Sequence, residues 1–183
     1  MRQCDDALVA ELAVLLSKEH SRKQRDLVVN WIGTDTEKIS AAMHVLCHHP
    51  YRAFQRVAWV IDGVAEKHPE LIVPHLEALM RRLDKKPLPD AVKRNIIRIL
   101  SFVSLPEEIH SKAVHTCFEY LSSPSEPIAV RAFAISVLYR LSKIYPEIKT
   151  ELKELLELEL EKLPSPGIKS RAQKTLSQLR KPG

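Results

Sequence analysis

The dipeptide Pro-Glu occurs three times in the chain, at spacings of 37 and 40 residues: Pro69-Glu70, Pro106-Glu107 and Pro146-Glu147. Each copy falls between two apolar stretches that have the periodicity of an amphipathic helix. The segments that precede the copies are also alike, and they begin at Arg56, Arg94 and Arg131. A repeat of about 20 to 50 residues is the sequence signature of stacked supersecondary units. We therefore predict an array of helix pairs.

The composition favours helices over sheets. Of 183 residues, 45% are hydrophobic and 28% are charged, which is the balance of a globular protein that can bury a core. Only four glycines accompany twelve prolines, and the prolines lie mainly at the joints between apolar stretches. This distribution is typical of many helices joined by short loops.

We expect ten helices in five antiparallel pairs, and we call the first helix of each pair A and the second B. The expected A helices cover residues 4–18, 35–49, 69–84, 106–122 and 146–163. The expected B helices cover residues 21–33, 50–68, 88–104, 126–145 and 165–182. Ser21 is expected to cap the first B helix, and Asp35 or Thr36 the second A helix. The repeated prolines suit first helical turns, whereas Pro74 lies deeper in its helix and should bend it.

Helix pairs with a period near 38 residues and a basic residue early in the second helix resemble HEAT-like repeats, over most of the chain. The resemblance implies an all-α fold: a right-handed α-solenoid of about five antiparallel helix pairs, forming a single domain over residues 1–183. In typical repeats of this family, an Asp between the helices pairs with an Arg of the second helix. The nearest matches here are Asp90 with Arg94 and Glu126 with Arg131.

Charge is divided between the two helix classes. The acidic and basic side chains give the A helices a net charge of −9 and the B helices a net charge of +12, within a chain total of +5. The resemblance implies that A helices line the convex outside and B helices the concave inside. We therefore expect a concave groove that is more positive than the outer wall and that attracts anions.

A helical wheel identifies the B-helix residues that lie opposite the core side of their own helix. Basic residues alternate there with two aromatic ones, as is common at protein interfaces. The predicted partner-binding residues are Arg52, Arg56, Trp59, Arg94, Arg98, Tyr139, Lys143 and Lys174.

Each of these residues also has a structural interpretation. Arg56, Arg94 and Arg131 could instead hydrogen-bond the neighbouring inter-helix turns. Trp59 could pack against the next repeat, and Trp31 is expected in the core. The remaining basic residues could form an ordinary solvated surface.

Sequence motifs for catalysis or cofactor binding are missing. The chain has no Gly-rich phosphate loop, no HExxH motif, no nucleophile elbow and no paired cysteine motif, and we expect no cofactor. His44, Cys47 and His48 lie on one helix face beside His49, but no other His/Cys cluster accompanies them, so no metal site is predicted. Trp59, Asp62 and Arg56 invite comparison with HEAT-like DNA alkylpurine glycosylases, an enzymatic alternative.

Three unpaired cysteines, no signal peptide and no apolar stretch long enough to span a bilayer favour a cytoplasmic protein without a membrane role. The leading hypothesis is a non-enzymatic repeat scaffold whose basic concave groove binds a protein with an acidic segment. The first alternative is nucleic-acid binding, because basic residues with interleaved aromatics also suit phosphates and stacked bases. The sequence leaves the oligomeric state and the identity of the partner open.

Overall fold

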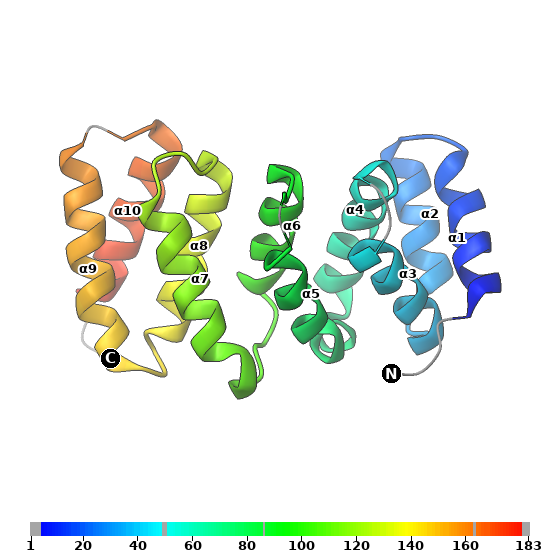
Figure 1. The fold of residues 1–183 in the computed structure, drawn as a ribbon, viewed down its shortest axis with the longest axis horizontal. Helices are drawn as coiled ribbons and strands as arrows, with labels where there is room; N and C mark the ends of the chain where they lie inside the picture. The colour runs from blue at the N-terminus through cyan, green and yellow to red at the C-terminus, as the bar shows by residue number, and fades with distance from the viewer. Residues whose placement is uncertain (1–4, 49–50, 86, 163, 181–183) are drawn as a thin grey trace. The chain divides into compact units, whose positions relative to one another are not determined.

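The computed structural model describes residues 5–48, 51–85, 87–162 and 164–180, with the side chains of Tyr51, Arg52 and Phe54 outside the description. Within these residues the chain forms ten α-helices, three short 3-10 helices and no strand (Figure 1). The predicted all-α class is thereby confirmed. The A helices are α1 (Asp6–Ser17), α3 (Thr36–His48), α5 (Leu76–Leu83), α7 (His110–Ser122) and α9 (Pro146–Glu161). The B helices are α2 (Arg22–Ile32), α4 (Tyr51–Lys67), α6 (Asp90–Leu100), α8 (Ile128–Leu141) and α10 (Pro166–Leu179).

The chain divides into two compact units. Unit 1 comprises Met1–Val92 and Val103–Leu105, and it contains α1 to α5. Unit 2 comprises Lys93–Phe102 and Pro106–Gly183, and it contains most of α6 together with α7 to α10. Each unit has its own buried apolar core. That the whole chain acts as a single domain stays a prediction.

In unit 1, the helices pack as two successive pairs (Figure 1). Helix α1 packs on α2 and α3, and α4 packs on both α2 and α3. Because α4 contacts its own A helix and the preceding B helix, it is buried on more sides than a wheel with one core face predicts. Gly63, which lies on the same side of α4 as Arg56 and Trp59, is buried: a Cβ there would lie 2.8 Å from Cγ2 of Val29 in α2.

The predicted helix starts are largely confirmed. The Ser21 side chain accepts a hydrogen bond from the backbone N–H of Gln24 at 3.0 Å. Asp35, rather than Thr36, caps α3, since its Oδ1 accepts from the N–H groups of Glu37 and Lys38. Such caps satisfy N–H groups that have no partner within the helix.

The predicted helix over residues 69–84 is wrong in its first half. Two 3-10 helices, η1 (Pro69–Leu71) and η2 (Val73–His75), precede α5, which has only eight residues. Pro74 cannot donate a backbone hydrogen bond, and the chain around it uses bonds between residues three apart, such as that from His75 N to Ile72 O at 3.0 Å. Pro74 therefore replaces the helix instead of bending it. A third 3-10 helix, η3 (Glu107–Ile109), likewise precedes α7.

In unit 2, α8 is the central helix. It packs on α7, α9 and α10, and its residues Val130, Ala134, Val137 and Leu138 are fully buried. Helix α10 contributes the apolar seam that the sequence predicts, with Ile168, Ala172, Leu176 and Leu179 all buried. The seam joins the last helix to the core of unit 2.

Gly63 offers a test of the close contact between α2 and α4. We expect Gly63→Ala to lower the free energy of unfolding by about 1 kcal/mol, because overpacking costs about 1 to 3 kcal/mol and outweighs the gain of about 1 kcal/mol in helix propensity. Urea denaturation measures the difference. Gly167→Ala is the matched control: its Cβ would lie 3.2 Å from Cγ2 of Ile128, which is half exposed and free to move. An unchanged or more stable Gly63→Ala variant would contradict the close approach.

Candidate functional site

Two of the B-helix arginines bind the C-terminal ends of helices in the preceding pair. Arg56 in α4 donates from Nη1 to the backbone carbonyl of Leu16 at the end of α1. Arg140 in α8 donates from Nη1 to the carbonyl of Leu100 at the end of α6, at 3.0 Å. The last carbonyls of a helix have no partner within it and carry the negative end of the helix dipole. Arg56, a predicted partner-binding residue, therefore has a structural role in unit 1.

Trp59 packs against the preceding repeat. Its ring centroid lies 5.2 Å from that of His20, and the guanidinium carbon of Arg25 in α2 lies 5.8 Å from its centroid. Of the two interpretations given for Trp59, these contacts match inter-repeat packing. Trp31, which was expected in the core, is only half-buried, and its indole N–H donates to Oε1 of Glu11 at 3.0 Å.

Arg131 forms the most buried ion pair described in unit 2. Its Nε donates to the carbonyl of Leu121 at the end of α7, at 3.1 Å, and its Nη2 donates to Oε2 of Glu159 in α9. Lys162 also binds Glu159, whose side chain is only 4% exposed. The turn interaction predicted for Arg131 is confirmed, but its acidic partner is not Glu126.

Glu126 pairs with the helix of the preceding repeat instead. Its carboxylate accepts hydrogen bonds from Nζ of Lys93 at 2.7 and 2.8 Å, and both side chains are largely buried. The Lys93 ammonium also lies 5.8 Å from the ring centroid of Tyr120 in α7. The match of Glu126 and Arg131 to the family's Asp–Arg pattern is therefore not an ion pair, because each residue binds its opposite charge across a helix interface.

The predicted binding residues in unit 2 are more accessible than those in unit 1. Arg94, Lys143 and Lys174 are exposed, and Arg98 and Tyr139 are half-buried. The Lys143 ammonium lies 4.8 Å from the ring centroid of Tyr139, which forms a cation–π pair at the end of α8. We call these five residues the unit 2 basic surface. The remaining predicted residue, Arg52, has a side chain outside the described part of the chain.

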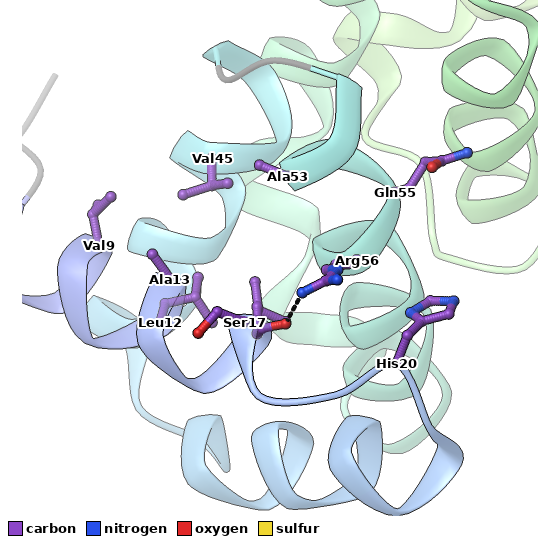
Figure 2. Close-up of a pocket in the computed structure, with 10 residues that line it drawn as sticks. Val9, Leu12, Ala13, Ser17, His20, Val45, Ala53, Gln55 and Arg56 are labelled. Atoms are coloured by element: carbon purple, nitrogen blue, oxygen red, sulfur yellow. Dashed lines mark hydrogen bonds between the residues drawn. The ribbon is translucent and has the colours of Figure 1, made fainter.

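Unit 1 contains a cleft that the sequence did not predict. It has a volume of about 630 Å³ and lies between α1, α3 and α4 (Figure 2). The described part of its wall is apolar along α1 and at two further positions, Val45 and Ala53. Its polar lining residues are Ser17, His20, Gln55 and Arg56. The Arg56 side chain reaches from α4 toward the end of α1 (Figure 2).

Within each unit, the helices form pairs, and neighbouring pairs stack on one another. A family model described as HEAT repeat domain matches residues 12–179. The chain belongs to the HEAT repeat domain family. Comparison with the curated proteins and with the solved structures found no match. HEAT repeat domains are generally repeat scaffolds rather than enzymes, and the predicted α-solenoid class is confirmed.

The histidine cluster of this HEAT repeat domain borders a second cleft, of about 390 Å³, between α3 and η2–α5. The rings of His44 and His48 stack with centroids 4.6 Å apart, and burial lowers the pKa of the facing His75. Burial also raises the pKa of Cys47 against the opposing effect of Arg82, Lys85 and Arg81. Within the described residues, no group of three or more His, Cys, Asp or Glu side chains is placed to hold a metal ion.

The enzymatic alternative depended on Asp62. This residue lies in the middle of α4 and is 4% exposed. A catalytic carboxylate must come within hydrogen-bond reach of its substrate, so the burial of Asp62 does not favour a glycosylase role. In the described part of the chain, none of the helices is both long and apolar enough to cross a bilayer. The cytoplasmic location stays a prediction.

The sequence contained signals for only some of these contacts. An apolar helix face is recognisable from the spacing of Val9, Leu12, Ala13 and Leu16. No sequence rule shows that part of this face borders an open cleft. Arg140 was not a candidate, although it lies 40 residues after Leu100, as Arg56 lies 40 residues after Leu16. The two contacts are not repeat equivalents, because Leu16 ends an A helix and Leu100 ends a B helix, so the repeat length alone does not identify Arg140.

Glu159 provides a test of the buried charges in unit 2. Burial alone raises the pKa of this carboxyl, but hydrogen bonds from Lys162 and Arg131 outweigh burial and hold the pKa below its usual value. A carboxyl with a lowered folded-state pKa contributes stability above its unfolded pKa, and the contribution is lost as pH falls through the folded pKa. We expect Glu159→Gln to cost about 3 kcal/mol at pH 7 and much less at pH 3, measured by urea denaturation.

Glu157 on the same helix is the control site for this experiment, since its side chain is 43% exposed and its described ion pair is with Arg180, at 3.5 Å. Glu157→Gln should change the free energy of unfolding by less than about 0.5 kcal/mol at either pH. A cost for Glu159→Gln that does not depend on pH would show that its ionisation does not stabilise unit 2.

Proposed function

We propose that this HEAT repeat domain is a non-enzymatic scaffold that binds a protein partner carrying an acidic segment, and that the unit 2 basic surface makes the contact. The observation that carries the proposal is the accessibility of Arg94, Lys143 and Lys174, set against the internal contacts of Arg56 and Arg131. Basic side chains that bind neighbouring helices contribute to stability. Those left exposed are available to a partner.

The chemistry of this surface suits carboxylates on a protein chain. Arginine and tyrosine are enriched among the residues that dominate interface energies, and Tyr139 lies beneath the Lys143 ammonium. A carboxylate partner would gain charge-assisted hydrogen bonds from Arg94 and Lys174. Nucleic acid is disfavoured because the net charge of the chain is only +5 and much of the B-helix charge is used internally.

Charge reversal within the unit 2 basic surface, compared with charge reversal on an A helix, tests the proposal. We expect the double variant Lys143→Glu/Lys174→Glu to lose at least about 90% of the partner captured from native cell extract, because two attractive contacts become repulsive. The matched control is Lys149→Glu/Lys153→Glu, which makes the same charge change at exposed positions of α9. This control should retain its partner, and both variants should keep the circular dichroism of the native helices.

Nuclease treatment of the extract separates the two kinds of partner. Capture of an acidic protein should persist after digestion, whereas loss of all captured protein would favour nucleic acid and overturn the proposal. Equal recovery by both double variants would also overturn it, because the unit 2 basic surface would then make no specific contact.

A further inference from the structure

Arg56 differs from Arg131 in one respect that points to a ligand. Both arginines donate to the last carbonyls of a preceding A helix, in unit 1 and unit 2 respectively. Arg131 also binds the buried carboxylate of Glu159. Among the described residues, Arg56 forms no ion pair with a carboxylate, and it lines the 630 Å³ cleft of unit 1. A guanidinium has five N–H donors, so one bond to Leu16 leaves most of them for another acceptor.

Most of the described cleft wall is apolar, apart from Arg56, Ser17, His20 and Gln55. Val9, Leu12, Ala13 and Leu16 follow one another along α1, with Val45 and Ala53 from α3 and α4. At 1.5 Å per residue, the stretch from Val9 to Leu16 is about 10 Å long. Arg56, Ser17 and His20 lie toward the C-terminal end of this stretch (Figure 2). The cleft therefore has an apolar length and a cationic end, and its volume falls within the range of about 300 to 1,000 Å³ found for small-molecule sites.

We propose that this cleft binds an aliphatic carboxylate, a straight hydrocarbon chain that ends in a carboxyl group. The hydrocarbon lies along the apolar face of α1, where it covers Val9 and Ala13. The carboxylate accepts charge-assisted hydrogen bonds from the Arg56 guanidinium, in the role that Glu159 has beside Arg131. This binding site is separate from the unit 2 basic surface and does not depend on the partner proposed for it.

Decanoate is the probe for this site. We expect decanoate to raise the melting temperature of the full chain by about 5 to 10 °C at about 100 times its Kd, because a ligand that binds only the folded state stabilises it. Isothermal titration calorimetry gives the Kd. Decanol, which has the same chain length and no charge, should bind at least about tenfold more weakly, since it cannot form the charge-assisted hydrogen bonds that a carboxylate accepts from the Arg56 guanidinium.

A pair of tryptophan variants on α1 locates the binding site. Ala13 is exposed and lines the cleft, so Ala13→Trp should fill it and abolish the decanoate response. Ala10 is exposed on the same helix outside the cleft, and Ala10→Trp should bind decanoate as the native chain does. The melting temperature of each variant without ligand shows whether it is folded.

Three results would overturn the proposal. The native chain could fail to bind decanoate, which would show that the cleft is not a site for aliphatic carboxylates. Folded Ala13→Trp could bind decanoate with unchanged Kd, which would place the ligand elsewhere. Decanol could bind as tightly as decanoate, which would remove the carboxylate from the interaction. None of these results would bear on partner capture by unit 2.

Discussion

The exposed carbonyls at the C-terminal end of a helix need hydrogen-bond donors, and in both units arginines from later helices supply them. Arg56 binds the carbonyl of Leu16, and Arg140 binds that of Leu100, in each case 40 residues earlier in the chain. Hydrogen bonds to a charged donor contribute about 1.5 to 3 kcal/mol, and more is lost when a buried acceptor has no partner. The Arg140 guanidinium is half-buried at this contact, and burial lowers its pKa.

This constraint explains part of the division of charge between A and B helices. Helices α4 and α8 each contact their own A helix and a neighbouring repeat, so basic side chains on B helices meet helix ends and carboxylates of other helices. Lys93 with Glu126 and Arg131 with Glu159 are contacts of this kind. The net charge of the B helices therefore overstates the positive surface available to a partner, and unit 2 retains the larger exposed share.

The sequence predicted the repeat, the ten helices and most of their starts because proline positions, caps and apolar periodicity are local signals. It failed where the outcome depends on a neighbour. Pro74 is expected to bend a helix, but two 3-10 helices form instead. Pro74 has no backbone N–H and therefore cannot donate the hydrogen bond that would continue an α-helix begun at Pro69. The wheel places Trp59 opposite the core, although α2 covers that face, where Gly63 also lies. The unit 1 cleft had no signal, since its shape depends on three helices at once.

The 40-residue distance between a capping arginine and its carbonyl also restricts how such a chain can change in length. Duplication or loss of one complete helix pair keeps every guanidinium opposite a helix end, because donor and acceptor move together. An insertion of half a pair would place an A helix where Arg56 or Arg140 now lies. We expect related chains to differ in length by whole helix pairs, with shorter insertions confined to the loops outside these contacts.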